Sequence, residues 1–153
     1  MRLFSLRNLF LTLAFAFAFH ATAFAKGDTR VFGKWTTIDD KTKQPKSIVE
    51  IKLVNGKLTG TILRLFRKKT EEQDPNCDKC SGDRKDKKII GMTIIWGMTA
   101  KDNVTWGNGK ILDPANGKEY GCSIWLDDKN PNNLKVRGWL AFFYRDQTWI
   151  RFK

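Results

Sequence analysis

The sequence predicts an all-β protein: an up-and-down antiparallel β-barrel of about eight strands, preceded by a cleaved signal peptide. Short runs of alternating apolar and polar residues recur after residue 30, and Gly, Asn, Asp and Pro separate them. No part of this region has the apolar spacing of about 3.6 residues that marks an amphipathic helix. Removal of a 25-residue signal leaves 128 residues, which suffice for one domain. Residues 26–153 are therefore expected to form a single barrel.

The first 25 residues have the features of an export signal. Arg2 and Arg7 precede an apolar run over residues 9–19, and an Ala-Phe-Ala pattern ends at Ala25. Small residues of this kind are typical of a signal cleavage site. We therefore expect cleavage after Ala25, with Lys26 as the mature N-terminus, and a periplasmic or secreted product.

A membrane anchor is the alternative for this segment. A spanning helix needs about 20 apolar residues, whereas His20 soon interrupts the run. No later stretch is long and apolar enough to span a bilayer, so no transmembrane segment is expected in the mature form. Cleavage also removes His20, the only histidine, and with it any Ser-His or Cys-His couple and any histidine metal site. We expect no enzymatic activity, no cofactor and no metal.

The chain is strongly basic. Its formal net charge is +12, and subtraction of Arg2 and Arg7 leaves +10 for the mature protein. Such a surface attracts polyanions. The charge is scattered, since residues 67–88 hold eight basic and six acidic residues. This distribution favours solubility and weak adhesion to anionic envelope material over a dedicated polyanion site.

The first three expected strands are set by alternation and by one tight turn. Residues 31–38 form the first run, and a polar turn separates it from the run 47–54, in which Val49, Ile51 and Leu53 alternate with Glu50 and Lys52. Asn55-Gly56 is the residue pair that a two-residue hairpin prefers, because both positions adopt positive φ angles. It leads into the third expected strand, residues 57–66.

A charged segment over residues 67–88 follows the third strand. It holds almost no apolar residue and is therefore expected to lie on the surface, although it is long for a loop in a compact domain. The fourth expected strand, residues 89–98, is apolar on both faces. The fifth, residues 106–112, ends at the turn sequence of residues 113–117, which contains Pro, Asn and Gly.

The last three expected strands are residues 118–126, 134–144 and 147–152. A polar turn with a proline separates the first two of them. Alternation within the run 134–144 places Phe142 on the same side as Leu134. Consecutive hairpins of this kind can close into a barrel, which removes the exposed strand edges that otherwise invite aggregation.

Cys77 and Cys80 form a Cys-x-x-Cys motif with three interpretations. A redox pair needs the first cysteine at a helix N-terminus, and the polar residues after Cys80 do not resemble such a helix. A zinc site needs four ligands, and Cys122 is the only further cysteine. A structural disulfide that holds the long loop is favoured in an oxidising compartment, with the redox pair as the alternative. Cys122 lies on an apolar strand face and is expected to be a buried free thiol.

An eight-stranded barrel can enclose one small ligand. Six tryptophans give this domain a high aromatic content, although core packing is the ordinary role for any one of them. Gly60, Gly91 and Gly138 are expected to enlarge the interior. The residues expected to contact a ligand in the interior are Trp96, Trp106, Tyr120, Arg137, Trp139 and Phe142.

Arg137 has two interpretations of equal standing. It lies mid-strand between Val136 and Gly138, where an inward charge would need a partner, and Asp113 and Glu119 are the acidic candidates. An inward arginine would orient an anionic group of the ligand. An outward arginine would form an ordinary surface pair.

Several motifs follow one another in the order seen in a bacterial family. They are Gly33-x-Trp35-Thr-Thr-Ile-Asp-Asp, Lys46-Ser-Ile-Val, Asn55-Gly-Lys-Leu-x-Gly60, Cys77-x-x-Cys80-x-Gly82, Gly109-Lys-Ile-Leu-Asp-Pro114-x-Asn-Gly117-Lys-x-Tyr120, Leu134-Lys-Val-Arg-Gly138 and Gln147-Thr-Trp149-x-Arg151. This series resembles the bacterial domain of unknown function 2147 (DUF2147). The resemblance implies a lipocalin-like barrel exported to the periplasm and brings no catalytic residues with it, because the family has no established activity. Residues 144–146 are Tyr-Arg-Asp, where that family usually has Gly-Arg-Thr, so the resemblance does not extend to this turn.

Gly33-x-Trp35 together with a late arginine also resembles the lipocalin pattern. In that pattern a basic side chain from near the end of the barrel covers a tryptophan of the first strand, and Arg151 is the candidate here. A guanidinium stacked on an indole contributes about 0.5–2 kcal/mol. We expect Gly33, Trp35 and Arg151 to close one end of the barrel.

The sequence thus favours an exported barrel that binds a small, partly apolar ligand or an envelope component in its interior. One alternative is a periplasmic thiol oxidoreductase that uses Cys77 and Cys80. The other is a cationic protein that binds anionic envelope polymers. No specific nucleic-acid partner is expected, since export argues against one.

Overall fold

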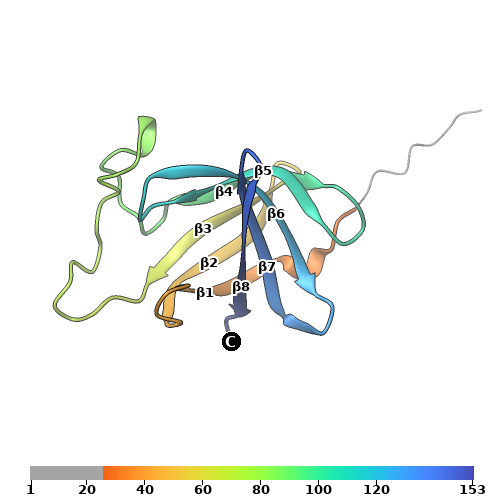
Figure 1. The fold of residues 1–153 in the computed structure, drawn as a ribbon, viewed down its shortest axis with the longest axis horizontal. Helices are drawn as coiled ribbons and strands as arrows, with labels where there is room; N and C mark the ends of the chain where they lie inside the picture. Colours follow the sequence, from red (N-terminus) through yellow and green to blue (C-terminus); the bar gives the residue numbers. More distant parts are fainter. Residues whose placement is uncertain (1–25) are drawn as a thin grey trace, which may run out of the picture.

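Eight antiparallel strands close into a barrel in sequence order, with each strand paired to its neighbours along the chain and β8 paired to β1 (Figure 1). The computed structural model describes residues 26–153, so the expected signal and its cleavage after Ala25 lie outside the described residues. The strands are β1 (Gly33–Ile38), β2 (Pro45–Val54), β3 (Lys57–Leu65), β4 (Thr93–Ala100), β5 (Trp106–Asp113), β6 (Lys118–Asp127), β7 (Asn130–Leu140) and β8 (Phe143–Arg151). Two short 3-10 helices, η1 (Thr29–Val31) and η2 (Gly82–Arg84), lie before β1 and between β3 and β4. The predicted all-β barrel is confirmed.

Closure of the barrel follows from the alternation of apolar residues along its strands. Val49 and Ile51 in β2, and Leu134 and Val136 in β7, are buried, whereas the residues between them face outward. These inward side chains form one continuous core. No helix among residues 26–153 is long and apolar enough to cross a membrane.

The last hairpin differs from the prediction. A single strand over residues 134–144 was expected, but β7 ends at Leu140 and β8 begins at Phe143, which pair with each other across a two-residue turn. Ala141 adopts a φ of 53° in this turn. Neither Ala141 nor Phe142 is a residue that such turns prefer, so the sequence carries no signal for the reversal.

Two of the three glycines expected to enlarge the interior do not do so. A Cβ atom at Gly60 would lie 3.1 Å from Ile95, so this glycine permits close packing instead of leaving space. Gly91 lies in the segment between β3 and β4 with a φ of 86°. Gly138 does line the cavity described below.

Candidate functional site

A cavity of about 570 Å³ opens at one end of the barrel. The β1–β2 turn, the β5–β6 turn, the β7–β8 hairpin and the start of the segment after β3 surround its mouth. Its inner part reaches Trp149, which is almost fully buried. Apolar side chains dominate its wall, and they include Ile62, Leu65, Ile94, Ile111, Val136 and Leu140.

A chain of polar groups runs along β8 from the interior to the mouth. Trp149 Nε1 donates a hydrogen bond to Gln147 Oε1 at 3.2 Å, and Gln147 Nε2 donates to Asp40 Oδ2 at 2.7 Å. Arg145 forms an ion pair with the same carboxylate. Residues 145, 147 and 149 lie on the cavity side of β8 because alternate residues of a strand share a face; Trp149 is buried, whereas the Arg145 side chain at the mouth is 64% exposed. This wall therefore offers hydrogen-bonding groups beside an apolar space.

Two further polar pairs lie in the lining. The hydroxyls of Thr37 and Ser47 are 2.7 Å apart, and both residues are buried, so they satisfy each other inside the barrel. Lys46 Nζ lies 3.7 Å from Asp113 Oδ1 at the mouth. At the mouth, the Lys46 ammonium thus lies beside the Asp113 carboxylate.

The other end of the barrel is closed around a fully buried indole. Trp35 Nε1 donates a hydrogen bond to the Val31 carbonyl at 2.8 Å, and the Arg151 guanidinium lies 4.0 Å from the centre of the Trp35 ring. Burial lowers the pKa of Arg151. Gly33 has a φ of 116°, a backbone conformation that favours glycine. The structure places Gly33, Trp35 and Arg151 together at this end.

Arg151 also ties the chain before β1 to the last strand. Its Nη2 donates to the Arg30 carbonyl at 2.6 Å, and its Nη1 donates to the Phe32 carbonyl at 3.3 Å. Trp106 lies at the same closed end, where its ring centre is 5.7 Å from that of Phe32 and its Nε1 donates to the Asp28 carbonyl. Trp106 therefore helps to close this end of the barrel and does not line the cavity. The expectation that it contacts a ligand in the interior is wrong.

Of the residues expected to contact a ligand, only Tyr120 lines the cavity. Trp96 lies on the outer wall beneath the Arg84 guanidinium, 4.1 Å from its ring centre. Trp139 covers Gly121 on the outside of β6. Phe142 occupies the β7–β8 turn and is 84% exposed. The expectation that these three aromatic residues lie in the interior is wrong. Trp96 and Trp139 occupy positions in β4 and β7 whose side chains face outward, and Phe142 lies in a turn instead of a strand.

Arg137 also faces outward, which decides between its two interpretations. Its Nε and Nη2 donate to the two carboxylate oxygens of Asp146 at 2.6 and 2.7 Å. This pairing holds the pKa of Asp146 below its ordinary value. The partner is neither Asp113 nor Glu119, the acids that proximity in sequence had suggested. Arg145, in contrast, lies on the cavity side of its strand, at the mouth.

Sequence reasoning missed the polar wall of Asp40, Arg145, Gln147 and Trp149. The available signal was the alternation in β8, in which residues 145, 147 and 149 share one face. This signal can be used only if the start of β8 is known. Residues 141–142 contain no typical turn residue, so the sequence does not show where β8 begins. Asp40 lies in a turn, where alternation gives no information about direction.

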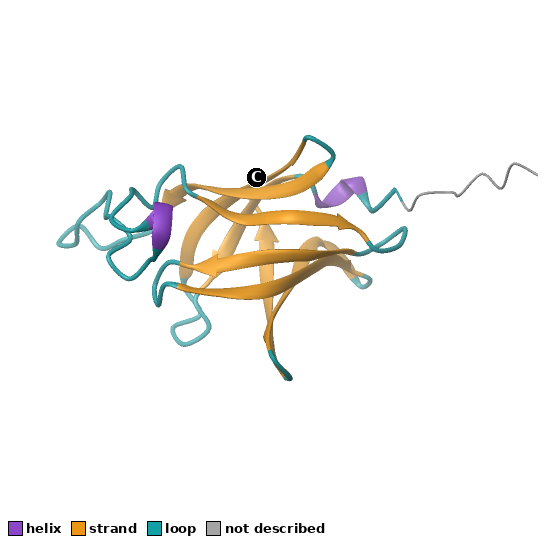
Figure 2. Ribbon diagram, turned by 90° about the horizontal axis from the view of Figure 1, so that it is seen from above, coloured by secondary structure: helices purple, strands orange, loops and turns teal. Residues whose placement is uncertain are grey.

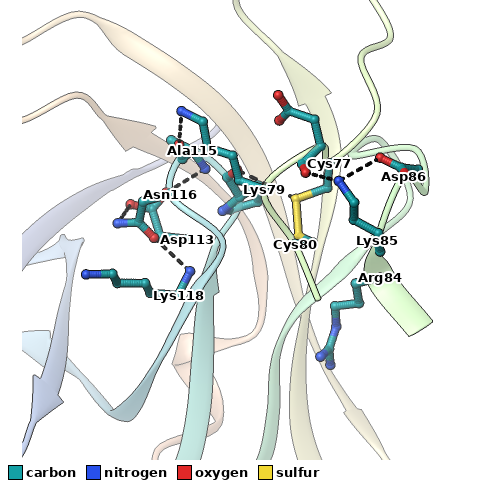
Figure 3. Close-up of a disulfide and its surroundings, with 12 residues drawn as sticks. Cys77, Lys79, Cys80, Arg84, Lys85, Asp86, Asp113, Ala115, Asn116 and Lys118 are labelled. Carbon is teal, nitrogen blue, oxygen red and sulfur yellow. Dashed lines mark hydrogen bonds and ion pairs between the residues drawn. A yellow bond between two sulfur atoms is a disulfide. The ribbon is translucent and has the colours of Figure 1, made fainter. Parts of the chain in front are cut away.

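The cysteine motif holds the long segment between β3 and β4 against the barrel (Figure 3). Cys77 and Cys80 form a disulfide. Lys79 Nζ donates to the Ala115 carbonyl in the β5–β6 turn at 3.2 Å. A Cβ atom at Gly117 would lie 1.8 Å from the Lys79 carbonyl oxygen, so only glycine fits here. The disulfide thus braces a loop that packs beside the cavity mouth.

The environment of the disulfide argues against the thiol oxidoreductase hypothesis. Cys77 is fully buried and Cys80 nearly so, whereas a redox pair needs an accessible sulfur. The following helix, η2, has three residues and begins at Gly82, so its N-terminus does not carry the first cysteine. Among the described residues, no group of three or more His, Cys, Asp or Glu side chains could hold a metal ion.

Replacing both Cys77 and Cys80 with serine is expected to lower the free energy of unfolding by about 2 kcal/mol, because the unfolded chain gains the entropy of an open ring. Hydrogen exchange should become faster over residues 77–85. Urea unfolding and exchange measured by mass spectrometry check these two effects. A reductant should shift the parent protein and leave the double variant unchanged. If the parent reduces or oxidises insulin catalytically, the bond is not merely structural.

Cys122 provides a pH-dependent prediction. Burial raises the pKa of its thiol to about 12. Below a pH of about 8.5 the thiol is neutral in both the folded and the unfolded chain, so its contribution to stability is complete. As the pH rises toward 12, only the unfolded chain ionises, and stability falls by about 1.4 kcal/mol per pH unit.

Between pH 9 and pH 11 the parent is therefore expected to lose about 2–3 kcal/mol more stability than Cys122→Ala. Urea unfolding at several pH values measures the difference. The comparison between the two slopes cancels the titration of lysines, which both proteins share. Parallel pH dependences would mean that the folded protein ionises this thiol as readily as the unfolded chain does.

The closed barrel, with an apolar cavity open at one end and a tryptophan–arginine pair at the other, has a lipocalin-like fold. A family model described as "Uncharacterized protein conserved in bacteria (DUF2147)" matches residues 33–151, and the chain belongs to this family. Among solved structures, protein HP1028 of Helicobacter pylori, described as belonging to the lipocalin family, superposes with a TM-score of 0.65. The two sequences are 14% identical, and the match covers 79% of this chain and 82% of that one, so the likeness concerns the fold. None of the curated proteins matches the sequence.

Proposed function

We propose that this protein is an exported, non-enzymatic binding protein that holds one small, mostly apolar ligand in its barrel. The observation that carries the proposal is the cavity of about 570 Å³, which is open at one end and closed at the other by Trp35 and Arg151. Pockets for small molecules have volumes of about 300–1,000 Å³ and are mainly apolar, with few polar groups. Export is supported by the signal-like N-terminus and by the Cys77–Cys80 disulfide, which suits an oxidising compartment.

The distribution of polar groups narrows the ligand class. Near the mouth Arg145 pairs with Asp40 and Lys46 with Asp113, and the charged side chains of Arg67 and Glu71 also line the cavity. Gln147 and the hydroxyl of Tyr120 supply uncharged hydrogen-bonding groups in the same region. A ligand with an apolar body and a polar, hydrogen-bonding head therefore fits this cavity.

Native mass spectrometry of the protein purified from a bacterial periplasm tests the proposal. We expect one small molecule per chain, released by mild organic extraction. Titration of the extracted protein with long-chain alcohols, fatty acids and aromatic compounds should then change tryptophan emission saturably, because Trp149 lines the cavity. Trp149→Phe, which removes this reporter, should diminish the change. No co-purifying molecule together with no saturable response to the whole panel would contradict the proposal.

A further inference from the structure

The tip of the β7–β8 hairpin exposes a continuous group of large apolar side chains. We call the residues 140–144 the hairpin tip: Leu140, Phe142, Phe143 and Tyr144 are 55%, 84%, 72% and 66% exposed, and Ala141 lies among them. The hairpin extends away from the body of the barrel, toward the bottom of Figure 2. Soluble proteins seldom expose contiguous apolar surface without a partner for it. The hairpin tip is therefore a candidate docking element.

The hairpin tip has regular β structure up to its turn. Strand pairing continues to its last pair, Leu140 with Phe143, which leaves only a two-residue turn. Its two phenylalanine rings pack with their centres 4.7 Å apart. The Arg137 guanidinium lies 4.5 Å from the Tyr144 ring on the outer face. The ladder thus presents these side chains in a fixed arrangement.

The apolar surface of the hairpin tip is continuous with the cavity. Leu140, Phe143 and Tyr144 all line the mouth while remaining largely open to solvent. A partner that covered the hairpin tip would consequently face the entrance of the cavity. Because the hairpin tip adjoins the cavity mouth, a ligand dissolved in the apolar phase that covers the tip could enter the cavity directly.

Positive charge lies beside the hairpin tip. Arg145 follows it directly, and the ion pair of Arg145 with Asp40 ties β8 to the β1–β2 turn. That turn carries Lys41 and Lys43, both exposed, together with Asp39, whose carboxylate accepts hydrogen bonds from the backbone of the turn. The whole chain has a formal net charge of +12. Apolar side chains flanked by cations are the combination that binds the interfacial region of anionic bilayers, where apolar burial and attraction to lipid headgroups add together.

We propose that the hairpin tip inserts into the interface of a bilayer that contains anionic lipids and so places the cavity mouth on the membrane surface. Phe142 and Phe143 enter the boundary between headgroups and acyl chains, to a depth of about 5–10 Å. Tyr144 stays at headgroup level, where its hydroxyl meets water. Lys41 and Lys43 contact the headgroups. Passage of a ligand between membrane and cavity rests on the proposed function, but the docking itself does not.

A fluorescent label at residue 142 tests the insertion directly. Phe142→Cys provides one accessible thiol among the described residues, because Cys122 is buried and Cys77 is bonded to Cys80. The probe is a nitrobenzoxadiazole label, and the vesicles contain phosphatidylethanolamine and phosphatidylglycerol. We expect a blue shift of its emission on these vesicles and a weaker one on pure phosphatidylcholine. Val104→Cys, labelled in the same way at an exposed site at the opposite end of the barrel, should show no shift.

Vesicle flotation supplies the quantitative test. The double variant Phe142→Ser/Phe143→Ser should bind anionic vesicles at least about tenfold more weakly than the parent, whereas Val104→Ser should bind equally well. All these positions are exposed, so folding should be preserved, which thermal unfolding verifies. Ligand titration of the single variant Phe142→Ser, whose side chain does not line the cavity, separates docking from ligand binding, since a folded variant that still binds ligand has lost only the membrane contact.

Two outcomes would overturn the proposal. One is an equal response of the labels at residues 142 and 104, with unchanged flotation of the double variant. The other is a blue shift without vesicles that grows with protein concentration, accompanied by a dimer in sedimentation that the double variant abolishes. That second outcome would assign the hairpin tip to a second copy of this chain.

Discussion

Replacing Trp35 with alanine is expected to lower the free energy of unfolding by about 3–5 kcal/mol, the range for losing a large buried aromatic side chain. Trp35 has no exposed surface, and its indole N–H is bound to the Val31 carbonyl. The substitution would empty the closed end of the barrel and leave the partly buried Arg151 without the ring beneath it. Urea-induced unfolding followed by circular dichroism measures the change.

Two matched variants divide the effect between packing, hydrogen bonding and charge. Trp35→Phe keeps most of the apolar ring but leaves the Val31 carbonyl without its donor, and it should cost about 1–3 kcal/mol. Arg151→Met keeps the chain length but removes the cation and its bonds to the Phe32 and Arg30 carbonyls. A loss below about 1 kcal/mol in Trp35→Ala would mean that the closed end contributes little to stability.

The parts of the fold that the sequence predicts well are those with local signals. Alternation located most strands, and Asn55-Gly56 identified the tight turn between β2 and β3. The turn between β7 and β8 lacks such a signal, because Ala141 and Phe142 read as a continuation of an apolar strand. The turn is set instead by the pairing of β7 with β8, in which Leu140 lies opposite Phe143, and this pairing depends on tertiary structure and not on the local sequence.

The candidate site was predicted less well, and the reason is physical. Tryptophans were assigned to the interior because aromatic residues usually supply burial energy. In this barrel Trp96 and Trp139 instead cover the outer wall, where Arg84 stacks on one and Gly121 leaves room for the other. Aliphatic residues such as Ile62 and Val136 line the cavity. Whether a side chain faces the interior depends on its odd or even position along the strand, and not on the type of residue.

Gly138→Leu is expected to weaken ligand binding roughly tenfold to a hundredfold, the effect of about 1–3 kcal/mol of steric conflict. Gly138 lines the cavity, and a Cβ atom there would meet Tyr120 Cβ at 3.6 Å and Ile111 at 3.8 Å, which are ordinary contacts. Its backbone is not in the left-handed region. The leucine side chain can therefore be accommodated by the fold while it occupies space that the ligand would use.

Gly138→Leu is informative because it should weaken ligand binding while leaving the stability of the barrel almost unchanged. Leucine suits a strand interior better than glycine, so the stability of the barrel should change by less than about 1 kcal/mol. Lys52→Leu adds the same side chain to an exposed position of β2 and should leave ligand affinity unchanged. Fluorescence titration with the molecule recovered from the native protein measures both. Equal affinity of parent and Gly138→Leu, with both folded, would move the binding site out of the barrel, because a ligand inside it could not avoid the added side chain.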